Sequence, residues 1–137
     1  MSIETIDPIF ALVRQDERTW AEYEAVRRDI KERFATVSES FRAPEQWDEE
    51  YKRAGLPFTP ANEDEWWEPQ LLVLDDADVA VIECQPRTLA GLAAKTARLS
   101  RLSRLQNGTG DHGHLSDAAM FTALGLDAEA LLEGSAS

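Results

Sequence analysis

The chain has few of the residues that covalent cross-links and metal sites require. It contains one cysteine, Cys84, and two histidines among 137 residues. A lone cysteine excludes an intramolecular disulfide and a cysteine-rich zinc module. No apolar run approaches the roughly 20 residues of a membrane-spanning helix. The first residues also lack the basic and apolar regions of a signal peptide, so we expect a cytoplasmic protein without a membrane partner.

Basic residues are also scarce. The chain has 14 Lys and Arg against 26 Asp and Glu, which gives a net charge of −12, while its 43% of hydrophobic residues is ordinary for a globular protein. The length suits one domain, residues 1–137. Because so negative a chain repels a polyanion, we do not expect it to bind nucleic acid. An acidic surface can instead mimic nucleic acid and occupy a DNA-binding protein, which is one alternative function.

Glycine and proline are absent from residues 9–43, and this absence favours one long helix over residues 7–42. Asp7 and Pro8 suit its first positions, since Asp can cap a helix and Pro needs no N–H there. Apolar residues recur at steps of three and four, with Asp16 and Arg27 as polar interruptions; they are Ile9, Val13, Trp20, Tyr23, Ile30, Phe34, Val37 and Phe41. Such a seam predicts packing along another helix.

Residues 43–69 differ sharply in composition. They hold four prolines, many carboxylates and five aromatic side chains. Proline spacing argues against a long helix, although residues 45–54 can form two or three turns. We expect an irregular but ordered connection that packs on the helices. Trp66 and Trp67 either cover the core, which we favour, or form a docking segment with the neighbouring acids.

Residues 70–133 are predicted to form the C-terminal helices. Residues 71–84 fit either a helix or a short hairpin, and periodicity alone leaves both open. Thr88 is a candidate N-cap for a helix from Leu89 to about Gln106. The last helix should run from Ala118 to about Leu132, with a break near Gly125 and a new cap at Asp127. Residues 134–137 should form a frayed tail.

Two motifs carry a resemblance to a protein family. Residues 7–12, Asp-Pro-Ile-Phe-Ala-Leu, open the long helix, and residues 85–95, Gln-Pro-Arg-Thr-Leu-Ala-Gly-Leu-Ala-Ala-Lys, form a turn followed by a small-residue helix. This pair is similar to small uncharacterised helical proteins of alphaproteobacteria. The resemblance implies a bacterial protein with a helical fold and supplies no activity. It covers about a third of the chain, and its motifs are caps and packing positions.

Four basic residues stand together without an acid in the helix that begins at Leu89: Lys95, Arg98, Arg101 and Arg104. In so acidic a chain this cluster is a candidate interaction surface. One interpretation is contact with phosphates. We favour a match with the acidic residues 45–68, within the chain or between two subunits.

Asp111, His112 and His114 form the one local cluster with the character of metal ligands. Zinc sites need three or four protein ligands, and two histidines make the cluster a weak candidate. We expect a polar loop that caps the last helix, no cofactor and no catalytic residue. A metal-dependent enzyme that uses this loop is the second alternative function.

These patterns together predict an all-α protein in which the long N-terminal helix packs with two or three shorter C-terminal helices. The shorter helices should leave part of the apolar seam uncovered, and exposed seams are usually covered by a partner. We therefore expect a non-enzymatic adaptor, assembly or regulatory protein that binds itself or another protein. The candidate contact residues are Trp20, Tyr23, Ile30, Phe34, Trp66, Trp67 and the four basic residues.

Overall fold

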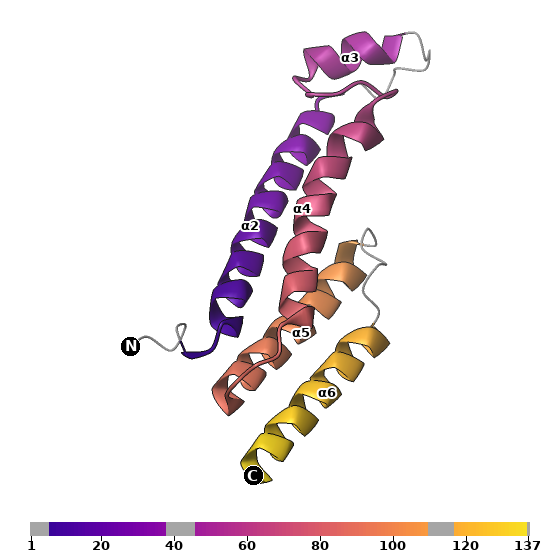
Figure 1. Cartoon of the computed structure of the whole chain (residues 1–137). Helices are drawn as coiled ribbons and strands as arrows, with labels where there is room; N and C mark the ends of the chain where they lie inside the picture. Colours follow the sequence, from indigo (N-terminus) through magenta and orange to yellow (C-terminus); the bar gives the residue numbers. More distant parts are fainter. Residues whose placement is uncertain (1–5, 38–45, 110–116, 137) are drawn as a thin grey trace. The chain divides into compact units, whose positions relative to one another are not determined.

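The computed structural model describes residues 6–37, 46–109 and 117–136, and this part of the chain is helical without a strand. Its helices are α2 (Ile9–Phe34), α3 (Trp47–Arg53), α4 (Glu63–Glu83), α5 (Leu89–Thr109) and α6 (Asp117–Ala136) (Figure 1). The all-α prediction is confirmed, including a long N-terminal helix that packs against shorter C-terminal ones. Over the same residues, none of these helices is both long and apolar enough to cross a membrane.

The chain divides into two compact units. The terminal unit contains Met1–Glu17 and Ala77–Ser137, and the middle unit contains Arg18–Asp76. Helices α2 and α4 each contribute one part to either unit. The two units are therefore described separately below.

Helix α2 begins as the sequence predicts and ends earlier. The Ile9 N–H donates to Asp7 Oδ1 at 3.4 Å, which caps the first turn. The helix ends at Phe34 instead of residue 42. Short i→i+3 bonds follow, from Thr36 N to Arg33 O and from Val37 N to Phe34 O, and the Thr36 hydroxyl also donates to Arg33 O. These bonds satisfy the last carbonyls, so the chain leaves the helix there.

Helix α4 shows that the connection is less irregular than predicted. The short helix α3 confirms the turns expected over residues 45–54. A second helix, however, already starts at Glu63 and runs to Glu83, so residues 71–83 are helical and the segment 71–84 is not a hairpin. Three acids occupy its first turn, where the helix dipole favours negative charge. The acidic cluster of residues 63–65 thus opens a helix.

Pro69 lies inside α4, where the sequence argument placed a break. A proline in a helix interior costs about 3 kcal/mol because it lacks an N–H and crowds the preceding turn. Trp66 and Trp67 lie three and two residues before it, and both pack against the buried cluster of Ile30, Leu56 and Phe58. This non-local packing holds the helix together across the proline.

The middle unit has an aromatic core. Phe58 lies within 5.2 Å of Trp66 and Phe34 within 5.2 Å of Tyr51, measured between ring centroids. Gly55 adopts a φ of 77°, which favours glycine, and its carbonyl accepts a 2.8 Å hydrogen bond from Arg33 Nη1. The described part of the connection is therefore ordered, as predicted.

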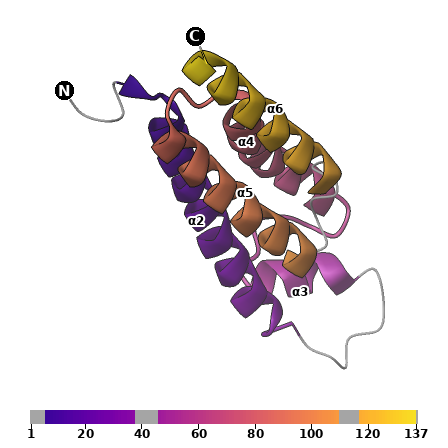
Figure 2. The same cartoon turned by 90° about the horizontal axis from the view of Figure 1, so that it is seen from below.

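In the terminal unit, α5 and α6 lie side by side and run in opposite directions (Figure 2). The predicted break at Gly125 is wrong, since α6 is continuous from Asp117 to Ala136. The tail expected at residues 134–137 is wrong as well, because Gly134 is helical. Asp127 is no cap; it is buried and pairs with α5.

Candidate interaction surface

The seam of α2 is covered by the chain itself. Ile9, Val13, Trp20, Tyr23 and Ile30 are all buried. The expectation that part of this seam stays open is wrong for these positions. In the middle unit, for example, Ile30 packs with Leu56 and Phe58, and the Tyr23 ring lies 6.0 Å from the Trp67 ring. Trp20, Tyr23 and Ile30 are accordingly not surface contact residues.

The aromatic candidates of the middle unit are also used internally. Phe34, Trp66 and Trp67 are half-buried and pack against the cluster of Ile30, Leu56 and Phe58. This arrangement matches the favoured interpretation, in which the tryptophans cover the core while the acids around them stay in water.

Lys95 points into the terminal unit and not to solvent. Its side chain is fully buried, and Nζ donates to Ile82 O at 2.7 Å, to Cys84 O at 2.8 Å and to Asp127 Oδ2 at 2.6 Å. The two carbonyls belong to the end of α4, so the ammonium group satisfies acceptors that a helix end leaves open. A single side chain thereby joins α4, α5 and α6.

Arg98 forms a second buried ion pair. Its Nε donates to Asp16 Oδ1, and both side chains are at least nine-tenths buried. Asp16 is the residue that interrupts the apolar seam of α2, and this pairing explains the interruption. The expected match of Lys95 and Arg98 with the acidic residues 45–68 is therefore wrong: their partners are Asp127 and Asp16.

Asp7 ties the start of α2 to the start of α5. Its Oδ2 accepts hydrogen bonds from the N–H groups of Arg87 and Thr88, both at 3.0 Å, and from the Thr88 hydroxyl at 2.8 Å. The Thr88 oxygen in turn accepts from Gly91 N at 2.9 Å, which confirms Thr88 as the N-cap. Burial would raise the pKa of Asp7, but these hydrogen bonds outweigh it and leave the pKa below its ordinary value.

Cys84 follows α4 and is half-buried. Burial raises the pKa of its thiol, and the nearby Lys95 ammonium only partly opposes this effect. A thiol with a raised pKa is a weak nucleophile at neutral pH. The thiol is therefore a poor candidate for a nucleophile.

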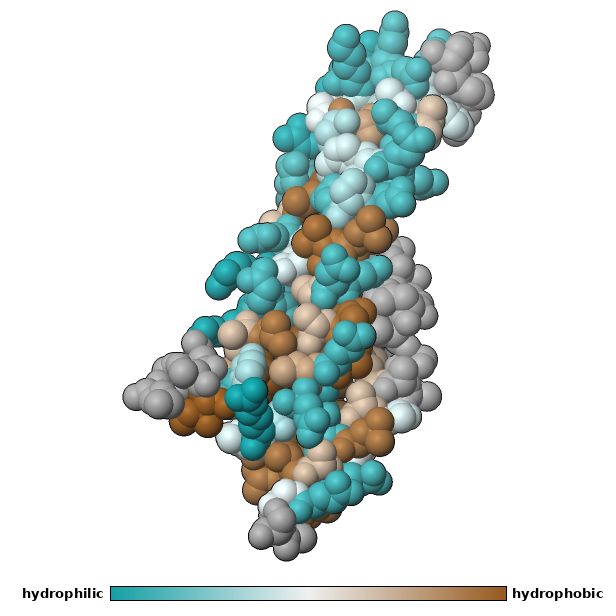
Figure 3. All heavy atoms as spheres, in the orientation of Figure 1, coloured by the Kyte–Doolittle hydropathy of each residue, from teal (hydrophilic) through white to brown (hydrophobic). Residues whose placement is uncertain are grey.

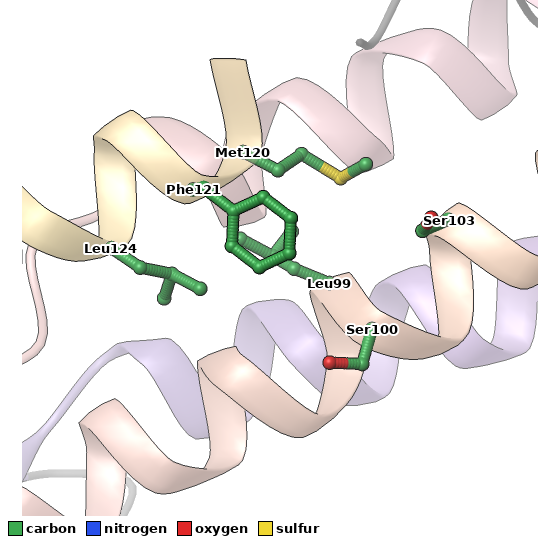
Figure 4. A pocket seen from close by; sticks show the side chains of 6 residues that line it. All are labelled: Leu99, Ser100, Ser103, Met120, Phe121 and Leu124. Atoms are coloured by element: carbon green, nitrogen blue, oxygen red, sulfur yellow. The ribbon is translucent and has the colours of Figure 1, made fainter. Parts of the chain in front are cut away.

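The basic helix keeps two exposed cations, Arg101 and Arg104. They lie on α5 beyond the buried pair formed by Lys95 and Arg98. Between them, Ser103 contributes to a cavity of about 200 Å³ that Leu99, Ser100, Met120, Phe121 and Leu124 also line (Figure 4). In this close-up the Phe121 ring, from α6, lies over the cavity.

The outer face of α6 is the feature that the sequence analysis missed. Phe121 is 70% exposed, Leu126 62% and Leu132 70%, while Met120 and Asp127 on the inner face are buried. Figure 3 shows such apolar side chains along α6 next to hydrophilic ones. The sequence signal was present, since α6 contains no basic residue and is apolar around most of its circumference.

Among the described residues no group of three or more His, Cys, Asp or Glu side chains is placed to hold a metal ion. The predicted loop of Asp111, His112 and His114 lies outside the described residues, so the metal hypothesis stays a prediction. No protein-family model, curated protein or solved structure matches the chain. The resemblance to small alphaproteobacterial proteins likewise stays a prediction, and function has to be inferred from the surfaces of the chain.

Proposed function

We propose that the protein is a non-enzymatic interaction protein, with an adaptor, assembly or regulatory role, and that it self-associates through the outer face of α6. The observation that carries this proposal is the exposure of Phe121 and Leu132, 70% each, on a helix whose opposite side is also apolar. A helix that is apolar around its circumference is typical of one covered on all sides. Burying a Phe or Leu side chain contributes about 1.5–3 kcal/mol. A partner that covers Phe121 and Leu132 would therefore gain this free energy on binding.

Gly125 supports a close contact on the same face. It lies four residues after Phe121 and three before Ala128, and no other described part of the chain beyond its own helix backbone and sequence neighbours comes within 4 Å of the point where its Cβ would be. A glycine in a helix interior costs about 1 kcal/mol relative to alanine. Among the described residues, no side chain or backbone packs into the space that the missing side chain leaves. A second helix that approaches the backbone at Gly125 would use it.

The spacing along one stripe of this outer face, which does not include Leu126, favours a second copy of this chain as the partner. Phe121, Gly125, Ala128 and Leu132 follow one another at steps of four, three and four, an order that reads the same in both directions. Two antiparallel α6 helices would therefore place Phe121 of one copy against Leu132 of the other, and Gly125 against Ala128. A two-fold interface requires this kind of self-complementary patch.

Sedimentation equilibrium of the full chain tests the proposal. Wild-type protein should form dimers at micromolar concentration, and Phe121→Ser should raise the dimer dissociation constant about a hundredfold or more, since each copy loses a buried ring. Leu89→Ser is the matched control, because Leu89 is 77% exposed but lies at the start of α5. A wild-type chain that stays monomeric, or equal weakening by both substitutions, would contradict the proposal.

Gly125 provides a variant that separates association from folding. Gly125→Leu should stabilise α6, because leucine is the better helix former, and the space around the glycine is open. The same side chain should block the close approach of a second helix and weaken the dimer at least tenfold. A more stable chain with unchanged association would show that the contact lies elsewhere.

A further inference from the structure

A second surface, in the middle unit, is an open groove between α2 and α4. Two adjoining cavities of about 310 and 470 Å³ share Val26 as part of their walls. Helix α2 lines them with residues that recur every turn along one side of the helix: Thr19, Glu22, Tyr23, Ala25, Val26, Asp29, Ile30 and Arg33. Helix α4 follows the same rule with Trp66, Pro69, Gln70 and Val73. Both helices thus turn one stripe of side chains toward a continuous groove.

The size of the groove suits a helix. The stripe on α2 spans about 21 Å at 1.5 Å per residue, or roughly four helical turns. Its floor contains the half-buried Val26 and Trp66, and Val73 on its wall is 59% exposed. Apolar grooves between two helices commonly bind the apolar face of a third.

The edges of the groove are acidic. Glu22 on α2 lines the groove and is exposed. On α4, Glu65 directly precedes Trp66 and Asp76 follows Val73 by three residues, and both acids are exposed. Arg33 does not balance them, since its Nε pairs with Asp29 Oδ2 at 3.0 Å. A bound helix would therefore meet an apolar floor between negatively charged edges. A second copy of a chain with net charge −12 is a poor occupant of such a groove.

We propose that this groove binds an amphipathic helix of a partner protein that carries an apolar ridge with lysine or arginine on both flanks. Apolar side chains at positions i, i+3 or i+4, and i+7 would fill the floor, and the basic flanks would face Glu22, Glu65 and Asp76. The groove lies in the middle unit, whereas self-association uses α6. The two proposals can therefore fail separately.

A displayed library of helical peptides of about 18 residues, long enough to span the groove, tests the inference. The ridge positions carry only Leu, Ile, Met or Ala, and the flank positions carry Lys, Arg, Glu or Gln at equal frequency. Selection on the full chain should enrich Lys and Arg over Glu on the flanks. The best binder, measured by fluorescence anisotropy, should lose affinity at least tenfold against Val73→Lys and should weaken as salt is added.

Leu89→Lys is the control variant, because it adds the same charge at another exposed apolar residue, which lies on α5. It should leave peptide binding unchanged. Flanks rich in Glu, the absence of any enriched peptide, or binding that is insensitive to Val73→Lys would overturn the inference. If Val73→Lys abolishes self-association instead, the groove is covered by a second copy and the basic partner is wrong.

Discussion

Asp7 Oδ2 occupies the space in which a side chain on Gly91 would begin, since a Cβ atom on Gly91 would lie 2.0 Å from it. The same oxygen accepts three hydrogen bonds from Arg87 and Thr88. The glycine and the carboxylate therefore depend on each other: a larger residue at 91 would displace the acid that joins the starts of α2 and α5.

Gly91→Ala should destabilise the protein although alanine is the better helix former. The added methyl group would push Asp7 from its hydrogen bonds, and overpacking of this kind costs about 1–3 kcal/mol. Gly125→Ala is the matched control, because the space around Gly125 is open; it should stabilise by about 1 kcal/mol. Urea unfolding in dilute solution measures both. Equal effects of the two substitutions would show that the contact with Asp7 is not important.

The pH dependence of stability should change with Asp7. Burial would raise its pKa, but the hydrogen bonds from Thr88, Arg87 and Ile9 outweigh burial and lower the pKa in the folded state below the ordinary 3.8. A lowered pKa means that the unfolded chain binds the proton more tightly. The contribution of ionised Asp7 to folding stability is therefore fully present above the ordinary pKa of the carboxyl group. It is lost as the pH falls through the lower pKa that Asp7 has in the folded state.

Asp7→Asn removes this titrating group and should flatten the stability curve below about pH 4 relative to wild type. Unfolding by urea at a series of acidic pH values gives the difference between the two curves. Parallel curves for the two proteins would contradict the role assigned to Asp7.

Asp127→Ala should release α6 before the rest of the chain unfolds. The substitution leaves the buried Lys95 ammonium with carbonyl partners from Ile82 and Cys84 but without its carboxylate. Removing one partner of a buried pair costs about 3–5 kcal/mol. Hydrogen exchange should show faster exchange in α6 than in α2. Glu129→Ala, at an exposed acid of the same helix, should leave the exchange rates unchanged.

Some of this fold follows from local sequence rules. The Asp7-Pro8 start of α2, its apolar seam and the Thr88 cap depend on nearest neighbours or on simple spacing, and the structure agrees with each. The end of α2 at Phe34 and the continuation of α4 through Pro69 depend instead on bonds and packing that the local pattern does not contain.

The direction of the charged side chains was the least predictable feature. Lys95 and Arg98 share a helix with Arg101 and Arg104, yet only the first two turn inward, because Asp127 and Asp16 meet them there. Those partners lie 32 and 82 residues away in the sequence. The exposed side of α6 was missed because the apparent break at Gly125 divided its stripe. The nucleic-acid mimic and the metal-dependent enzyme stay alternative predictions.

Salt should affect the two proposed contacts in opposite directions. Two copies with a net charge of −12 repel each other, and added salt screens this repulsion, so the dimer should become tighter. Binding of a basic helix to the groove between α2 and α4 should become weaker. Sedimentation measures the dimer dissociation constant and fluorescence anisotropy measures the peptide dissociation constant, both at the same series of ionic strengths. If salt changes the two constants in the same direction, one of the two assignments is contradicted.

The most direct measurement is a cross-link across α6. In a Cys84→Ser background, the variants Phe121→Cys and Leu132→Cys are mixed and oxidised gently at a concentration high enough to offset the weaker contact. Antiparallel pairing of α6 predicts that the mixed disulfide between residues 121 and 132 forms in preference to either symmetric one. Symmetric disulfides in equal yield, or no cross-link at all, would show that a second copy does not cover this face.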